Sequence, residues 1–314
     1  MGSQILISYL KNYSENVYRV VYEDHGRNEP FQYPSVAVCE MATWDKTNVA
    51  EEVFESEIFS HYPNLRMDPK ELINFLHRMA FQSLLFPNGN RIRNFINYAS
   101  TLDNKTKEVL FQRLQYRYLV NKIRSSCSDF FVTCQWQEEP FICCENFRDI
   151  STMLGKCFIL NSLQNFSSTG HRMVRNIEIY NEPYRLSLTF KNPAQIFLLN
   201  NKDLPETISP VPRYSIFDEN TQLNLEFTII PTINDPSLNG LDSSVTKCLQ
   251  SNRAKVFGNK TYSYHSYPGC ITDCLYIHQA KKCGCINLYH HLPKGEIIIL
   301  KYVHFVTEAL IVSV

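Results

Sequence analysis

Cysteines are the residues of this chain whose number and spacing could do chemistry. Eleven occur in 314 residues, and five of them form a group near the C-terminal end: Cys248, Cys270, Cys274, Cys283 and Cys285. In a helix, Cys270 and Cys274 would lie one turn apart on the same face. In an extended segment, Cys283 and Cys285 would point to opposite sides, so each would need its own partner. The group is typical of one half of a disulfide ladder, and no cysteine follows Cys285 to complete it.

Two other chemistries are open to these thiols. Short cysteine spacings can hold zinc, although a second C-x2-C pair is missing and the nearby histidines lack ligand spacing, namely His265, His278, His290 and His291. Reduced structural thiols of a cytosolic protein are the other alternative. Eleven cysteines are many for such a protein and fit an oxidising compartment better. Because the number is odd, at least one thiol stays unpaired or pairs between chains.

A second group of cysteines lies in residues 127–161, and its members are Cys127, Cys134, Cys143, Cys144 and Cys157. We expect two bridges among the first four, whose pairing the sequence cannot give. Cys143 and Cys144 are adjacent, and adjacent cysteines rarely pair with each other. Gly155 is expected to supply a turn with positive φ just before Cys157.

The composition narrows the function classes. Lys and Arg together number 31, as do Asp and Glu, so no net charge argues for a nucleic-acid partner. No nucleotide-binding glycine loop, zinc-protease or G-x-S-x-G motif is present, so we expect neither an enzyme nor a cofactor. Four N-glycosylation sequons favour an extracellular location, and they begin at Asn12, Asn104, Asn165 and Asn259.

The elements that must position the cysteines are helical in residues 45–123. Asp68, Pro69 and Glu71 form a helix start, and an apolar stripe follows at helical spacing: Leu72, Phe75, Leu76 and Met79. A second amphipathic run over Lys107–Ile123 is expected to turn one face inward, with Phe111, Leu114 and Tyr118 on it. Both stripes are interpreted as core packing.

Strands are expected on either side of the helices. Val36 and Val38 alternate with small residues ahead of Cys39, which predicts a short strand with one buried face. Alternating or apolar runs at 184–190, 195–199 and 223–230 predict further strands between turn-rich segments. A generic β-sandwich would explain this alternation equally well.

Neither end supplies a convincing membrane segment. The apolar run at 4–10 is too short to span, and Lys301, His304 and Glu308 interrupt the apolar tail at 296–314.

Three motif blocks resemble the degenerin/epithelial (amiloride-sensitive) sodium channel family, closest to its insect pickpocket branch. The segment 31–39 is similar to the family's F-P-x-V-T-[IL]-C, with Tyr33 for Phe and Ala37 for Thr. Residues 134–161 are similar to C-x-W/F, C-x-x-x-F and T-x-x-G-x-C-[YF]-x-F-N, with Leu160 where Phe is usual. The third block runs from Tyr262 to Pro293 and contains the last four cysteines.

The resemblance implies an α+β fold: a β-sheet palm, a helical finger and knuckle insert, and the start of a disulfide-braced helical thumb. It also implies that Cys157 bridges to Cys39. The expected domains are a juxtamembrane remnant (1–30), an extracellular domain (31–293) and an unmatched tail (294–314). Within the extracellular domain we expect the finger at about 45–125, the cysteine-rich block at 127–161, palm strands at about 176–245 and the thumb start at 248–293.

The function implied by the resemblance is that of a sodium channel subunit in the plasma membrane, mostly extracellular and gated by a ligand, acid or force. Its partners would be sodium ions, the membrane and other subunits in a homo- or heterotrimer. The resemblance stops after Pro293, before the family's second, pore-lining helix, so this chain alone is expected not to conduct. The alternative is a secreted or tethered disulfide-rich binding protein without a pore.

Overall fold

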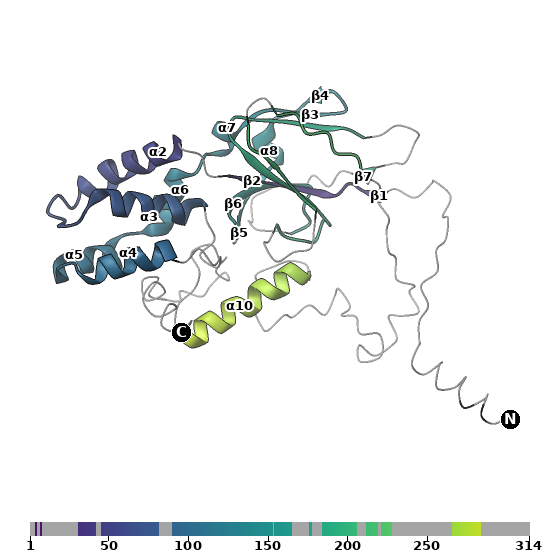
Figure 1. Ribbon diagram of the computed structural model, residues 1–314. Coiled ribbons are helices and arrows are strands. Elements are labelled where there is room, and N and C mark those ends of the chain that lie inside the picture. The colour runs from purple at the N-terminus through teal and green to yellow at the C-terminus, as the bar shows by residue number, and fades with distance from the viewer. Residues whose placement is uncertain are drawn as a thin grey trace.

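The computed structural model describes residues 31–41, 45–81, 90–152, 154–164, 184–205, 212–218, 221–227 and 266–283, together with residues 4, 7, 176 and 177. In these residues, one group of helices is separate from the antiparallel sheets. The helices α2 to α6 gather at one end, and the strands fill the other (Figure 1). The α+β character predicted from the sequence is confirmed.

The largest sheet has five antiparallel strands in the order β10-β9-β2-β6-β5. Their bounds are β2 Ser35–Glu40, β5 Arg148–Thr152, β6 Gly155–Leu160, β9 Ala194–Leu199 and β10 Arg213–Ile216. The central strand β2 pairs with β6 on one side and with β9 on the other. Its chain neighbours 31–34 lead directly into the middle of the sheet.

Strand β2 corrects the prediction of one buried face, because all six of its residues are buried. Val36 and Val38 belong to one apolar cluster, whereas Ala37 and Cys39 belong to another. A strand in the centre of a sheet that is covered on both faces has no solvent side. Small residues at the alternate positions are therefore a sign of close packing here and not of exposure.

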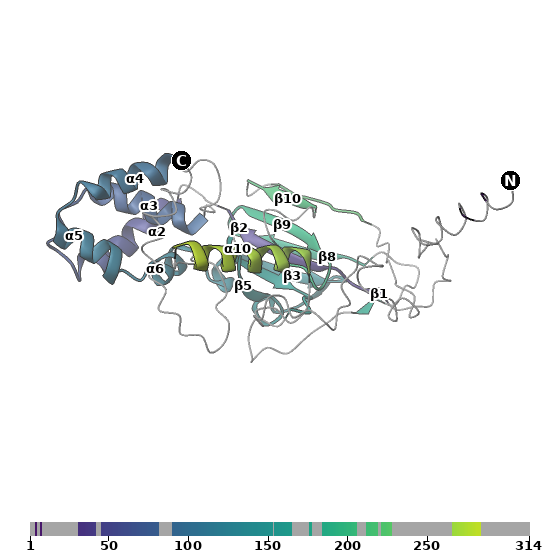
Figure 2. The ribbon, with the colours of Figure 1, turned by 90° about the horizontal axis from the view of Figure 1, so that it is seen from below.

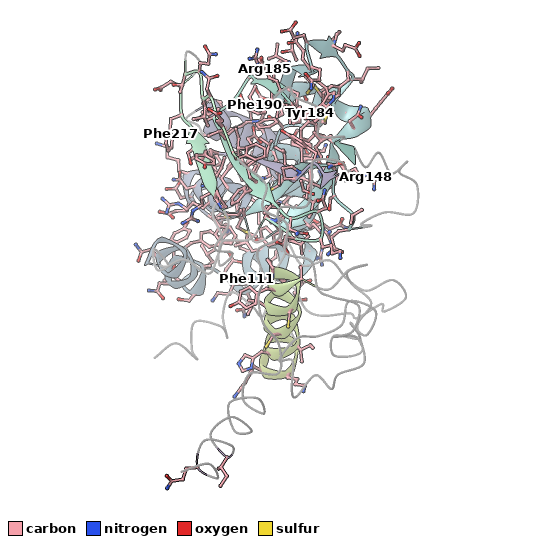
Figure 3. The ribbon with its side chains drawn as sticks, turned by 90° about the vertical axis from the view of Figure 1, so that its right-hand side faces the viewer. Phe111, Arg148, Tyr184, Arg185, Phe190 and Phe217 are labelled. Atoms are coloured by element: carbon pink, nitrogen blue, oxygen red, sulfur yellow. A yellow bond between two sulfur atoms is a disulfide. The ribbon has the colours of Figure 1, made fainter. Side chains whose placement is uncertain are left out.

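A second sheet of three antiparallel strands has the order β4-β3-β8, and β1 pairs with β7 in a separate two-stranded ladder. The bounds are β1 Phe31–Gln32, β3 Phe131–Trp136, β4 Glu139–Pro140, β7 Asn176–Ile177 and β8 Leu186–Phe190. Short helices α7 (Cys127–Phe130) and α8 (Cys143–Asn146) flank this sheet. Figure 3 shows Tyr184 and Phe190 in this part of the molecule and Phe217 beyond the end of β10.

Aromatic side chains join the two larger sheets. The rings of Phe130 and Phe158 stack with centroids 5.4 Å apart, and Phe131 contacts Phe158 and Phe190 at 5.5 Å. The predicted alternation of Leu186, Leu188 and Phe190 is present, with these residues half-buried between exposed neighbours. The predicted strand at 195–199 is part of β9. Of the strand predicted at 223–230, residues 223–227 form no strand, and residues 228–230 lie outside the described residues.

The helical layer comprises α2 Asp45–Val53, α3 Pro69–Phe81, α4 Asn90–Ser100, α5 Asn104–Glu108 and α6 Tyr116–Ile123, with wider π-helical turns at η1 (Phe54–Phe59) and η2 (Val109–Arg113). Helix α3 begins where Asp68, Pro69 and Glu71 predict it, and Asp68 accepts a hydrogen bond from the Lys70 amide at 3.0 Å. The predicted stripe is buried in full: Leu72, Phe75, Leu76 and Met79.

The prediction of the buried face in the second amphipathic run, Lys107–Ile123, is wrong. It is broken at Leu114, whose backbone is extended, so η2 and α6 do not share one helical register. Phe111 and Leu114 are only partly buried, and Tyr118 is 47% exposed. The buried face consists of Leu110, Leu119, Val120 and Ile123 instead.

Helix α10 (Tyr267–Cys283) lies apart from this helical layer. It lies below the sheets in Figure 1 and crosses in front of them in Figure 2, which views the molecule from below. Ser266 accepts a hydrogen bond from the Gly269 amide at the start of the helix, and Pro268 and Thr272 are buried there.

Candidate functional site at the junction of helices and sheet

Cys39 and Cys157 form a disulfide in the structure, the pair that the family resemblance implies. They are direct neighbours in the β2–β6 ladder, and both are almost fully buried. The bridge joins residues 118 positions apart. It therefore ties the strand that precedes the helices to the strand that follows them.

The four cysteines whose pairing the sequence left open also form two bridges. Cys127 pairs with Cys144, and Cys134 pairs with Cys143. The first bridge links α7 to α8, and the second links β3 to α8. The adjacent cysteines therefore have different partners, and both bridges fasten α8.

The C-terminal group of five cysteines is described only in part. Cys270 and Cys274 lie on α10, one turn apart, and neither is bonded to another described cysteine. Cys283 ends this helix, while Cys248 and Cys285 lie outside the described residues, so the pairing of this group stays a prediction. Among the sequons, Asn104 is exposed as the first residue of α5; Asn12, Asn165 and Asn259 lie outside the described residues.

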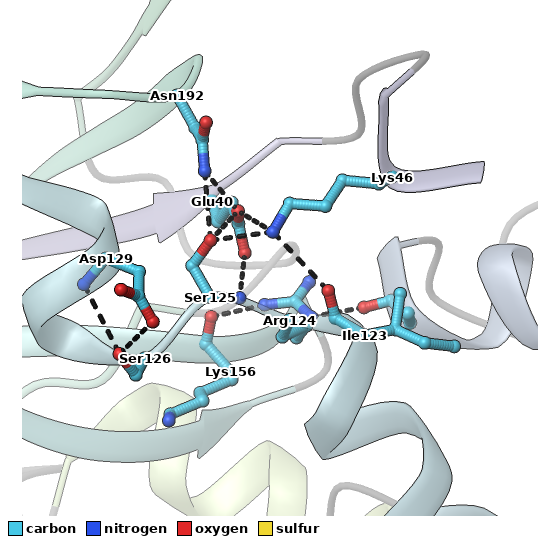
Figure 4. A network of polar contacts seen from close by, with 10 residues as sticks. Glu40, Lys46, Ile123, Arg124, Ser125, Ser126, Asp129, Lys156 and Asn192 are labelled. Atoms are coloured by element: carbon cyan, nitrogen blue, oxygen red, sulfur yellow. Dashed lines mark hydrogen bonds and ion pairs between the residues drawn. The ribbon is translucent and has the colours of Figure 1, made fainter. Parts of the chain in front are cut away.

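A buried carboxylate marks the point where the helices meet the sheet. Glu40, the last residue of β2, is 4% exposed. Its carboxylate accepts hydrogen bonds from the Ser125 amide at 2.9 Å and from the Ser125 hydroxyl at 2.6 Å. Asn192 Nδ2 donates to it at 2.8 Å, and Lys46 Nζ lies 3.1 Å away (Figure 4). Burying a carboxylate is costly unless it is paired and hydrogen-bonded, and here both conditions hold.

Arg124, the residue before Ser125, makes a second set of contacts across the same junction. Its guanidinium donates to the carbonyls of Ala80 on α3 and Lys156 on β6, and to that of Leu154 at 2.9 Å. The guanidinium also lies over the Phe81 ring, 4.9 Å from its centroid. One buried side chain thus binds the end of α3 and the start of β6 together.

Gly155 makes room for that guanidinium. Its φ is +95°, as expected of the predicted turn, and a Cβ built there would lie 2.3 Å from Arg124 Nη2. The glycine therefore meets two requirements at once, a left-handed backbone and a close approach. We call the set of Glu40, Lys46, Arg124, Ser125 and Asn192 the junction cluster.

The opposite end of the sheet holds a neutral polar cluster. Asn161 has a backbone φ of +61°, and its side-chain Nδ2 donates to the Tyr33 carbonyl. Asn201 Nδ2 donates to the same carbonyl at 2.7 Å and to the Asn161 carbonyl at 2.8 Å. Ser35 Oγ also donates to the Asn161 carbonyl, at 2.9 Å. The chain entering β2 is thereby fixed to the ends of β6 and β9, and burial raises the pKa of the Tyr33 phenol to about 12.

The disulfides and the two polar clusters connect structural elements to one another. Among the described residues, no three His, Cys, Asp or Glu side chains gather as metal ligands. The described part of the chain also contains no helix with the length and apolar character needed to cross a bilayer. What the junction cluster can do is hold two parts of the protein in one fixed relation, because its bonds join β2, α2, α3, β6 and the β8–β9 turn.

The junction cluster has no signature in the sequence. Glu40 and Arg124 stand at the ends of predicted elements, where charged residues are normally solvated. A clue exists in the immediate neighbours, since Glu40 follows the Cys39 motif and Arg124 follows an apolar helical face. Arg113, a basic residue dispersed among acids in the sequence, lies on the surface and pairs with Glu108 at 2.7 Å.

Comparisons with known proteins agree with the motif blocks. The family model described as "Amiloride-sensitive sodium channel" matches residues 1–307. Pickpocket protein 19 of Drosophila melanogaster is 24% identical in an alignment 312 residues long, which covers 90% of this chain and 54% of that protein. The chain thus spans about half the length of this curated relative. Since the family match covers nearly all of the sequence, the predicted membership is confirmed: this chain belongs to the amiloride-sensitive sodium channel family, a family of ion channels and not of enzymes.

Proposed function

We propose that this chain is the extracellular region of a pickpocket-type sodium channel subunit at the plasma membrane. Family membership supports the channel role. Three disulfides among the described residues support an oxidising compartment, because such bridges persist outside the cytosol. The exposed sequon at Asn104 is consistent with the same location.

The subdomains follow from this proposal. Helices α2 to α6 would be the finger, the two larger sheets with α7 and α8 the palm and knuckle, and α10 the first helix of the thumb. The neutral cluster around Asn161 would stand near the membrane, since β2 begins there and its chain would arrive from the membrane. Sodium ions would pass through a pore shared by three subunits, of the same or different kinds.

The junction cluster is the observation that best supports a mechanism in which movement of the finger is transmitted to β2. A ligand, acid or force acting on the finger displaces the pore only if the displacement reaches β2, the strand that leads back towards the membrane. Glu40 lies on β2 and is bonded to groups on α2 and on the α6–α7 link. Arg124 adds bonds to α3 and β6. A rigid connection transmits displacement, whereas a loose one absorbs it.

The test uses the full-length gene product expressed in oocytes. An epitope inserted at Asn104 should be labelled on intact cells, and an amiloride-sensitive sodium current should respond to a ligand, acid or membrane stretch. Glu40→Gln should reduce the response to the stimulus while surface labelling is retained, and Glu108→Gln, in an exposed pair, is the matched control. Labelling only after permeabilisation would overturn the location. Surface labelling without any sodium current would favour a binding protein without a pore.

A further inference from the structure

The three disulfides found among the described residues differ sharply in their access to solvent. The sulfurs of Cys39 and Cys157 belong to residues that are 2% and 0% exposed, and Cys134 is 2% exposed. Cys127 and Cys143 are half-buried, and Cys144 is exposed. Among the described bridges, Cys127–Cys144 is therefore the one with an exposed cysteine and with neither partner fully buried, so a reagent in solution reaches it most easily.

Its surroundings leave that approach open. α8 has only four residues, and its neighbour Ile142 is 62% exposed. The hydrogen bonds within residues 142–147 are local, with the Phe147 amide donating to the Cys143 carbonyl at 2.7 Å and Asn146 Nδ2 to the Ile142 carbonyl at 2.9 Å. Such bonds form within one short segment, and Phe147 at its end packs on Phe131 of β3 with ring centroids 4.5 Å apart. Loosening of α8 is therefore confined to its exposed turn, while this ring contact keeps the sheet in place.

We propose that the Cys127–Cys144 bridge is a redox-sensitive site that a small extracellular monothiol of the glutathione class opens while the other two bridges stay closed. A thiolate of the reductant attacks the sulfur of the exposed residue Cys144, and the S–S bond breaks with its electron pair leaving on Cys127, which takes up a proton. A second reductant thiolate attacks the mixed disulfide and releases Cys144 as a thiol. Two reductant thiols are oxidised to one disulfide, and the bridge is reduced to two thiols.

Opening this bridge would release α8 from α7 and leave it attached to β3 through Cys134–Cys143. The buried Cys39–Cys157 bridge would continue to join β2 and β6. The expected product is thus a folded protein in which only the surface of the cysteine-rich block is loosened. The proposal concerns the chemistry of the folded chain and does not depend on the proposed channel role.

Differential alkylation of the purified, oxidised full chain tests it. All thiols that are free in the oxidised protein are first blocked with N-ethylmaleimide. The protein is then treated with reduced glutathione for increasing times and quenched with isotopically heavy N-ethylmaleimide, and the labelled cysteines are identified by peptide mass spectrometry. Cys127 and Cys144 should acquire the heavy label together, at least ten-fold faster than Cys39 and Cys157. Labelling of Cys39 and Cys157, or of Cys134 and Cys143, at the same rate as Cys127 and Cys144 or earlier would overturn the proposal.

Two controls separate access from intrinsic reactivity. In a denaturing concentration of urea the difference in rate should vanish, because every bridge is then exposed; a difference that persists would contradict the structural explanation. The double variant Cys127→Ala/Cys144→Ala should remain folded and keep the other two bridges resistant to the same treatment. If this variant folds but loses Cys134–Cys143 to glutathione at once, the bridges do not open independently and the proposal fails.

Discussion

Glu40 shows how a single buried charge depends on every group around it. Its carboxylate accepts from Ser125 and Asn192 and pairs with Lys46, whose side chain is 12% exposed. In Glu40→Gln the ion pair is lost and an amide NH2 faces the other donors. We expect the free energy of unfolding to fall by roughly 3 kcal/mol, since removal of one partner strands the other charge. Urea unfolding measures this.

The control for that measurement is Glu108→Gln, which breaks the exposed pair with Arg113. Because solvent screens exposed pairs, no measurable change is expected. Equal effects of the two substitutions would show that burial does not set the contribution of Glu40. Adding Lys46→Met to Glu40→Gln should recover part of the lost stability, since the stranded ammonium is removed.

Gly155 carries a second prediction at the residue scale. An alanine there would have to adopt a φ near +95°, and its Cβ would meet the Arg124 guanidinium. Gly155→Ala should therefore lower the free energy of unfolding by roughly 2–4 kcal/mol, from backbone strain and overpacking together. The neighbouring Lys156→Ala has neither problem and should cost much less. A loss below about 1 kcal/mol for Gly155→Ala would show that Arg124 moves aside freely.

At the scale of elements, the turn between β3 and β4 is occupied by residues that do not suit it. Gln137 and Glu138 have φ of 54° and 70°, the pattern of a two-residue hairpin turn that favours Asn-Gly. We expect Glu138→Gly to raise the free energy of unfolding by about 1 kcal/mol, because glycine removes the left-handed penalty. Glu139→Gly, one residue later in β4, should lower it instead. Thermal unfolding of the pair checks both signs.

Prediction from the sequence is correct for one helix, α3, and wrong for the buried face of the run at 107–123. The start of α3 and its buried stripe follow from local chemistry, since Asp68, Pro69 and the apolar spacing all act within one helix. The same rule applied to the run at 107–123 predicts the wrong buried face. A break at Leu114 changes the register, and no residue there forces a break locally. Packing against the rest of the layer decides it.

The candidate site is less predictable for a related reason. Cysteine motifs can be recognised in a sequence from the residue type and spacing alone. The family resemblance also implies the Cys39–Cys157 pair that the structure contains. Glu40, Arg124 and Asn192 lie far apart in the sequence and are brought together only by the fold. A buried ion pair has no local pattern, because its partners are chosen by tertiary contact.

For the whole molecule, the bridges should stabilise in the order of the loops that they close. Cys39–Cys157 joins residues 118 positions apart, and Cys127–Cys144 joins residues 17 apart. The chain-entropy model gives about 5 kcal/mol for the first loop and about 3 kcal/mol for the second. Domain stabilities are typically ~5–15 kcal/mol, so removing the Cys39–Cys157 bridge costs at least about a third of such a total.

We therefore expect Cys39→Ala/Cys157→Ala to unfold at a clearly lower urea concentration than Cys127→Ala/Cys144→Ala. The buried pair also leaves a cavity between β2 and β6 when its sulfurs are removed, which adds to the difference. Circular dichroism and intrinsic fluorescence should follow one transition in the surface-bridge variant, since helices and sheet remain joined by the long loop and the junction cluster. If the surface-bridge variant proves the less stable of the two, loop length does not govern the stability of this fold, and the cysteine-rich block must be holding the sheets together instead.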